Sequence, residues 1–138
     1  MLARTNESAR ARSQRYNKLI KDCGADYRKA LEFLSMMKAD GRGGADVYGY
    51  NATISSCAKA GEWETAVALL GEMQRAGVPP NVVTFNATIG ACKQGEQFEM
   101  AMKVMDDMHK FNVKPDVISF SQAINTCEKS DKWQKIHI

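Results

Sequence analysis

Apolar residues recur along this chain in stripes with the spacing of an α-helix. Two stripes lie within residues 82–116, each with steps of 3, 4 and 3 residues: Val82, Phe85, Ile89 and Cys92, then Phe98, Ala101, Met105 and Met108. Such steps place side chains on one face of a helix. Gln94 and Gly95 interrupt the pattern between the stripes, and Asn112-Val-Lys-Pro115 ends the second one. The segment is predicted to form two helices joined by a turn.

The same pattern returns at a step of 35 residues. It begins at Val47, at Val82 and again at Val117, and each time a cysteine follows ten positions later. Residues 47–81 and 82–116 share eleven identities, most of them stripe residues or helix breakers. A fixed period of this length is typical of a solenoid, in which each repeat uses equivalent positions. The predicted fold is all-α, a right-handed α-solenoid of stacked helix-turn-helix hairpins.

The period divides the chain into a leader and four repeats. The expected boundaries are a basic leader at 1–12, a degenerate repeat at 13–46, full repeats at 47–81 and 82–116, and a truncated repeat at 117–138. The terminal repeats of a solenoid normally carry a polar cap over the exposed core. Neither end of this sequence has an evident one, so we expect a fragment of a longer array with fraying ends.

Charge is distributed unevenly. The formal net charge is +3, but residues 1–21 hold six basic residues against Glu7 alone, which leaves 13 basic and 15 acidic residues in the rest. A protein that binds nucleic acid mainly by neutralising phosphates needs a basic body. Any nucleic-acid recognition by the repeats is therefore expected to be local. No run approaches the roughly 18 to 20 apolar residues of a membrane helix, so no membrane partner is expected.

The cysteines follow the repeat period, with intervals of 34, 35 and 35 residues between Cys23, Cys57, Cys92 and Cys127. Equivalent places in adjacent hairpins are roughly 10 Å apart, beyond the roughly 7 Å limit for a disulfide. They are predicted to pack in the core. The sequence has two histidines, no H-x-E with a paired C-x-x-C, and no nucleophile–base arrangement. We expect no catalytic site, metal, cofactor or small-molecule substrate.

The repeats resemble the pentatricopeptide repeat family over about residues 13–138. The matching motif is clearest in Val82-Val-Thr-Phe-Asn86, Cys92-Lys93, Ala101, Met108 and Val113-Lys-Pro-Asp116. The tetratricopeptide signature W-x-x-L-G is missing from them. The resemblance implies a module that binds single-stranded RNA in a mitochondrion or plastid, one base per repeat, and acts in RNA processing, stability, editing or translation.

The resemblance also implies which residues meet the RNA. The base-recognition pairs are Asn17 with Asp46, Asn51 with Asn81, Asn86 with Asp116, and Ser121 with a partner that this chain does not contain. The base-packing residues are Tyr48, Val83 and Ile118, whereas Gln14 holds that place in the first repeat and departs from the pattern. The family code then predicts the target 5′-U-(C/U)-U-purine-3′.

The residues themselves leave alternatives open. Asp46, Asn81 and Asp116 each precede a predicted helix, where Asp and Asn are favoured caps. Asn51 and Asn86 lie five residues past the cap, where Asn is a poor helix former. Each stands one turn after an apolar residue, which suits base recognition, but bonding to the neighbouring hairpin is the alternative.

Three lysines recur near one repeat position, and the sequence also leaves a protein-binding function open. Lys59, Lys93 and Lys129 lie near the ends of the first helices, where they could meet phosphates or simply be solvated beside the helix C-terminus. Helical solenoids also bind peptides on their concave surface. The near-neutral charge of the repeats favours that alternative, a protein-binding scaffold, whereas the asparagine column favours RNA.

Overall fold

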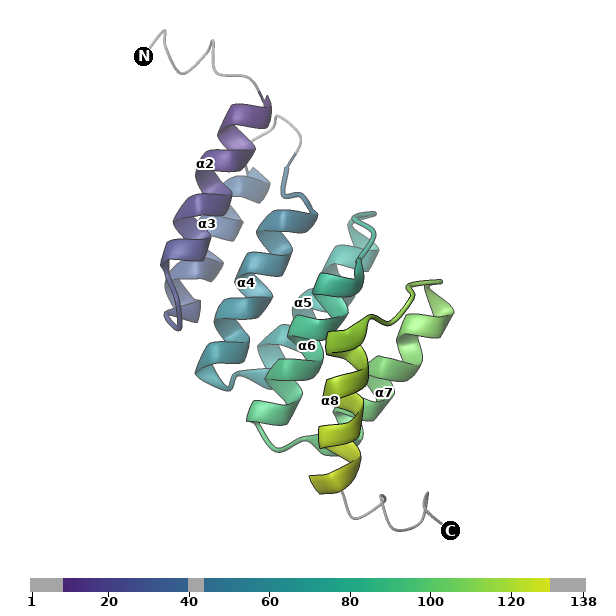
Figure 1. The fold of residues 1–138 in the computed structure, drawn as a ribbon. Coiled ribbons are helices and arrows are strands. Elements are labelled where there is room, and N and C mark those ends of the chain that lie inside the picture. Colours follow the sequence, from purple (N-terminus) through teal and green to yellow (C-terminus); the bar gives the residue numbers. More distant parts are fainter. Residues whose placement is uncertain (1–8, 40–43, 130–138) are drawn as a thin grey trace, which may run out of the picture.

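The computed structural model describes residues 9–39 and 44–129, and every regular element within them is an α-helix (Figure 1). The helices are α2 (Ala9–Asp22), α3 (Tyr27–Ala39), α4 (Val47–Ala60), α5 (Trp63–Arg75), α6 (Val82–Gln94), α7 (Phe98–Lys110) and α8 (Val117–Lys129). Helix α2 begins four residues before the expected start of the first repeat. The second helix expected in the last repeat falls on residues 130–138, outside the described residues.

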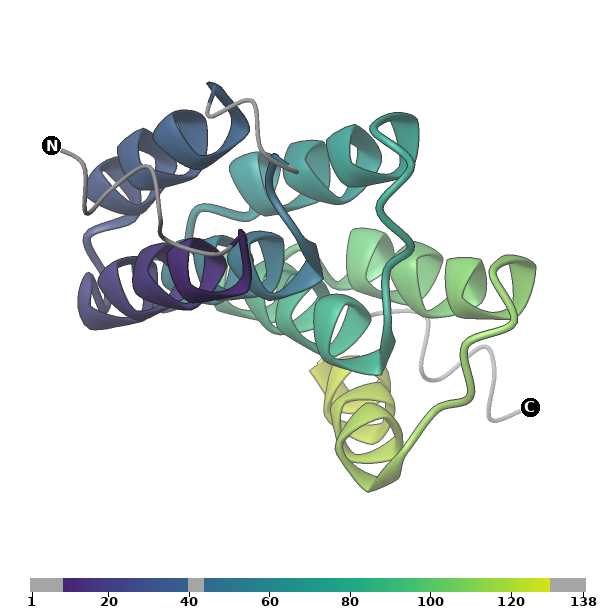
Figure 2. The same ribbon diagram turned by 90° about the horizontal axis from the view of Figure 1, so that it is seen from above.

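The helices alternate between two rows. Helices α2, α4, α6 and α8 lie side by side in one row, and α3, α5 and α7 form the other (Figure 2). Each helix of the second row contacts the first helix of its own hairpin and that of the next, so α5 packs on both α4 and α6. This stacking confirms the prediction of an α-solenoid of helical hairpins.

The core runs continuously between the hairpins and is built from the repeat columns. Tyr50 and Ile54 of α4 are almost completely buried, as are Phe85 and Ile89 at the equivalent places of α6. From the other row, Ala66 and Met73 pack against the same core. Burying one large apolar side chain contributes about 1.5–3 kcal/mol. The period thus fixes the fold because each repeat supplies the same buried face.

The turns inside the hairpins differ in detail from the expectation. Gln94 belongs to α6, and the residue in the left-handed conformation is Glu96, with φ of 57°. Gly61 holds the equivalent place in the preceding repeat, with φ of 72°. Gly95 has an ordinary φ, but a Cβ there would lie 2.5 Å from Cδ1 of Trp63. Its role is to admit the Trp63 ring.

The cysteines at the recurring repeat position pack in or beside the core, as far as their side chains are described. Cys57 and Cys92 are buried free thiols, and Cys23 is a half-buried one. Burial raises the pKa of the Cys57 and Cys92 thiols to about 11. The thiolate is the form that acts as nucleophile or metal ligand, so both stay protonated at neutral pH. The side chain of Cys127 lies outside the described part.

Candidate nucleic-acid interface

Two of the predicted asparagine pairs are joined by hydrogen bonds across the repeat boundary. Asn51 Nδ2 donates to Asn81 Oδ1 at 3.1 Å, and Asn86 Nδ2 donates to Asp116 Oδ1 at 3.0 Å. Both donor asparagines are largely buried, at 7% and 9% exposure. Each pair therefore links the first helix of one hairpin to the start of the next.

The same acceptor atoms also cap the helices. Asn81 Oδ1 accepts from the backbone N–H of Thr84 at 3.1 Å, and Asp116 Oδ1 accepts from that of Ser119 at 3.0 Å. In the first repeat boundary Asp46 Oδ1 accepts from the Gly49 N–H at 2.9 Å. Capping and pairing are thus two contacts of one oxygen atom, which the sequence presents as alternatives.

Two hydroxyl groups complete the network, and neither was among the residues predicted from the sequence. Thr84 Oγ1 donates to Asn51 Oδ1 at 2.5 Å, and Ser119 Oγ donates to Asn86 Oδ1 at 2.7 Å. Both hydroxyl residues are buried and stand three residues after the cap. A Thr or Ser at that interval is the available sequence signal, since it can return a hydrogen bond to the cap, as Thr84 does.

The first repeat lacks this arrangement. Within the described residues, no hydrogen bond joins Asn17 to Asp46, and Asn17 Oδ1 is a buried acceptor without a donor. Asp46 Oδ2 instead accepts from the Ser13 hydroxyl. Residue 49, which stands at the place of Thr84 and Ser119, is glycine and offers no hydroxyl.

Exposed apolar side chains flank the asparagines. Tyr48, Val83 and Ile118 are 66%, 52% and 58% exposed. In α4 and α6 the other large apolar side chains are buried or half-buried, whereas α8 also exposes Val117, Phe120 and Ile124. A groove of about 500 Å³ runs over α2, α4 and α6, and it brings together six of the sequence-predicted residues. They are Asn17, Tyr48, Asn51, Lys59, Asn81 and Val83.

The remaining predicted residues lie along the same row of helices. Ser121 is exposed on α8, and Gln14 is exposed on α2. Lys59 is exposed in the groove, and Lys93 is half-buried near the end of α6. The side chain of Lys129 lies outside the described residues.

The two complete pairs differ in charge. The backbone N–H of Ser119 and the amide of Asn86 both donate to Asp116, and these hydrogen bonds hold the pKa of its carboxyl below the ordinary value. Asp116 is therefore an ionised acceptor at neutral pH, whereas Asn81 is neutral. Within the described ranges, no three His, Cys, Asp or Glu side chains gather as a metal site would require. No described helix is both long and apolar enough to cross a bilayer.

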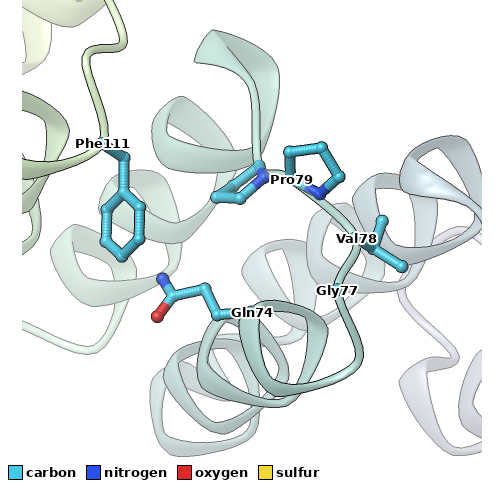
Figure 3. Close-up of a pocket in the computed structure, with 6 residues that line it drawn as sticks. Gln74, Gly77, Val78, Pro79 and Phe111 are labelled. Carbon is cyan, nitrogen blue, oxygen red and sulfur yellow. The ribbon is translucent and has the colours of Figure 1, made fainter.

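A second hollow has a different set of lining residues, which Figure 3 shows. It measures about 300 Å³ and is formed by Gln74, Gly77, Val78, Pro79, Pro80 and Phe111. These residues come from the ends of α5 and α7 and from the turn after α5. None of the residues predicted to contact RNA takes part in it.

A comparison with protein-family models shows the family of the chain. The model described as the PPR repeat family matches residues 45–94 and again residues 81–129. The chain belongs to the PPR repeat family. The resemblance inferred from the sequence motif is thereby confirmed, and the two matches cover the hydrogen-bonded pairs of both complete PPR repeats.

Solved PPR structures share this fold. The crystal structure of the pentatricopeptide repeat protein PPR10 from maize is similar with a TM-score of 0.73 and 24% identity, over 88% of this chain and 18% of that one. The crystal structure of PPR10 in complex with an 18-nt psaJ RNA element has a TM-score of 0.69 and 21% identity, over 95% and 20% of the chains. This PPR chain thus spans about a fifth of their length. No curated protein matches it in sequence.

Proposed function

We propose that these PPR repeats bind single-stranded RNA and recognise one base per repeat. The observation that carries the proposal is a recurring pair of features on one helix face. An exposed apolar side chain, Tyr48 or Val83, stands one turn before a buried, hydrogen-bonded asparagine, Asn51 or Asn86. Unpaired bases stack on such apolar surfaces and are recognised at their Watson–Crick edges.

The hydrogen bonds within the protein leave the asparagines able to contact a base. An asparagine amide has two donor hydrogens and two acceptor lone pairs. Asn86 uses one donor on Asp116 and one lone pair on the Ser119 hydroxyl. One donor and one acceptor remain for the base edge. We assign the pairs to the target 5′-U-(C/U)-U-purine-3′, in which Asn17, Asn51 and Asn86 meet the first, second and third bases and Ser121 the purine.

The affinity of this chain alone is expected to be low. Stacking of a base on a protein side chain contributes about 1–3 kcal/mol, and three bases at the middle of that range reach about 6 kcal/mol, between the millimolar and micromolar ranges. Lys59, Lys93 and Lys129 are proposed to add phosphate contacts along the groove. The presence of RNA in the solved PPR10 complex supports the ligand class.

The cellular role is assigned by family. We propose that the chain acts as part of a longer array in a mitochondrion or plastid, in the processing, stability, editing or translation of a transcript. This assignment is tested separately from binding, by the location of a fluorescently tagged full-length protein. A tag confined to the cytosol contradicts it and leaves RNA binding untouched.

The Asn86→Ala variant tests RNA recognition. We expect it to weaken binding to a 5′-UUUA-3′ strand by at least about 5-fold, because both contacts of the amide with the base are lost. Binding to a strand with adenine at the third base should change much less. Fluorescence anisotropy with labelled strands measures both, and circular dichroism verifies the helix content.

The matched control is Gln97→Ala, which removes an exposed amide at the start of α7, in the other row of helices and outside the groove. It should leave both affinities unchanged. Equal affinity of the unaltered protein for oligo-U and oligo-A contradicts the proposal and favours the protein-binding scaffold.

A further inference from the structure

The buried hydroxyls of Thr84 and Ser119 stand at one repeat position, the third residue of a first helix, and we call it the hydroxyl position. Each hydroxyl contacts the asparagine of the preceding repeat rather than of its own. Ser119 Oγ lies 2.7 Å from Asn86 Oδ1, and Thr84 Oγ1 lies 2.5 Å from Asn51 Oδ1. The network thus passes from one repeat to the next at both complete boundaries.

The direction of these hydrogen bonds is fixed by the cap. Ser119 Oγ accepts from the backbone N–H of Asp116 at 3.1 Å, so its single hydrogen is free to be donated. Two acceptors are in range, Asn86 Oδ1 at 2.7 Å and Asp116 Oδ1 at 3.0 Å. The nearer one is the asparagine carbonyl. The hydroxyl therefore holds the carbonyl side of the amide, while Asp116 holds the amino side.

An amide held on both sides presents one fixed order of donor and acceptor. Rotation by a half-turn about its bond to Cβ would exchange the two atoms. Uracil has a donor at N3 between two acceptors, whereas cytosine has an acceptor at N3 beside an amino donor, so the two bases need opposite amide orientations. A fixed amide distinguishes them, and an amide that rotates fits both.

The first repeat has lost this restraint. The hydroxyl position facing Asn17 is Gly49, and Asn17 Oδ1 is buried without a donor. A Cβ on Gly49 would lie 3.3 Å from Asn17 Oδ1 and 3.5 Å from Asp46 Oδ1. A serine there would therefore stand between Asn17 and Asp46, the counterparts of the asparagine and aspartate that Ser119 joins.

We infer that the hydroxyl position sets how strictly each repeat distinguishes uracil from cytosine, and that Gly49 makes the first repeat permissive. The inference rests on the proposed RNA binding and adds a positioning residue to each pair. Ser119 holds Asn86 for uracil, because its second partner Asp116 is a carboxylate and offers acceptors only. Thr84 holds Asn51 in the same way, but the Asn81 amide can rotate together with it and offer a donor, so the second base remains C or U. Asn17, which lacks the hydroxyl, accepts either pyrimidine. The first position of the target is then pyrimidine rather than uracil alone.

The gain-of-hydroxyl variant Gly49→Ser is the principal test. It should raise the ratio of affinities for strands with uracil and with cytosine at the first base by at least about 3-fold, the effect of one hydrogen bond. Gly49→Ala is the matched control, because it adds the Cβ without the hydroxyl and should leave the ratio near that of the unaltered protein. Both must displace Met37 Sδ, which a Cβ would meet at 2.8 Å and which belongs to a flexible but buried side chain.

The reverse test removes a hydroxyl. Ser119→Ala should lower the uracil-to-cytosine ratio at the third base by about 3-fold, since Asp116 still holds one side of the amide. Ser119→Thr should restore it. Thr126→Val, which removes an α8 hydroxyl bonded to the Gln122 carbonyl in its own helix, should not change it.

The outcomes separate the two proposals. Equal ratios for the serine and alanine variants at residue 49 overturn the inference, provided that the unaltered protein prefers uracil to adenine at the third base. Absence of that preference instead removes the proposed function, and the inference falls with it. A raised ratio with serine alone supports both.

Discussion

The two complete PPR repeats, 47–81 and 82–116, have the same fold but are joined to their neighbours differently. Their cores are matched: Ile54 and Ile89 are both fully buried, as are Cys57 and Cys92. The differences lie where helices begin, end or meet the next hairpin. Equivalent core positions make the repeats stack, and the junction positions give each repeat its own properties.

One junction difference concerns a polar link on the second row of helices. The Tyr50 hydroxyl donates to Glu72 Oε2 at 3.0 Å, and Lys38 Nζ, from the preceding repeat, meets the same oxygen at 2.8 Å. Phe85 holds the place of Tyr50 in the next repeat and has no hydroxyl; its ring centroid is 6.1 Å from that of Phe111. The same buried repeat position, residue 50 or 85, thus makes a polar contact in one repeat and an aromatic contact in the other.

The largest expected effect tests the equivalence of the cores. Ile54→Ala and Ile89→Ala should each lower the free energy of unfolding by about 2–5 kcal/mol, because each leaves a cavity at a fully buried site. Urea denaturation of the two variants measures it. A difference much larger than about 1 kcal/mol between them contradicts the view that the two repeats share one core.

A smaller effect is expected where Trp63 of one repeat meets Gly95 of the next. Gly95→Ala should destabilise the protein by about 1–3 kcal/mol, since the new Cβ would lie 2.5 Å from the indole. The same substitution in a Trp63→Ala background should cost little, because the opposing ring is gone. Denaturation of the single and double variants gives the coupling. An equal cost in both backgrounds contradicts a steric role for Gly95.

The sequence predicted the elements of this fold much better than their junctions. Stripes such as Val82, Phe85 and Ile89 predict helices because a local period of three and four residues is enough. The contact of Ser119 with Asn86 joins atoms 33 residues apart and depends on how two hairpins stack, which no local period encodes. The consequence of Gly49 for Asn17 is hidden for the same reason.

The turns inside the hairpins supply a third, still smaller contrast. Gly61 and Glu96 both have positive φ, which costs a residue with a Cβ about 1–2 kcal/mol. Glu96→Gly should therefore stabilise the protein by about 0.5–1 kcal/mol after the added entropy of the unfolded chain is counted. Gly61→Ala should destabilise it by about 1 kcal/mol. Thermal unfolding measures both, and a destabilised Glu96→Gly variant would show that the Glu96 side chain contributes more than its backbone costs.

The smallest expected effect is a pH dependence confined to one of the two repeat boundaries. Hydrogen bonds from the Ser119 N–H and from Asn86 lower the pKa of Asp116 in the folded protein. Its folded pKa is thus below the unfolded value of about 3.9, so the stabilisation is present above that pH and is lost as the pH falls through the folded pKa. Asn81, at the equivalent place, does not titrate.

The Asp116→Asn variant gives repeat 82–116 the neutral cap of repeat 47–81 and isolates this effect. Asn and Asp are similar helix caps, so stability at pH 7 should change little. Between about pH 5 and pH 2 the unaltered protein should lose more stability than the variant, which unfolding curves at each pH measure. Parallel pH profiles for the two proteins would mean that the charge of Asp116 contributes nothing to the free energy of unfolding. The Asp and Asn caps would then stabilise their repeat boundaries equally.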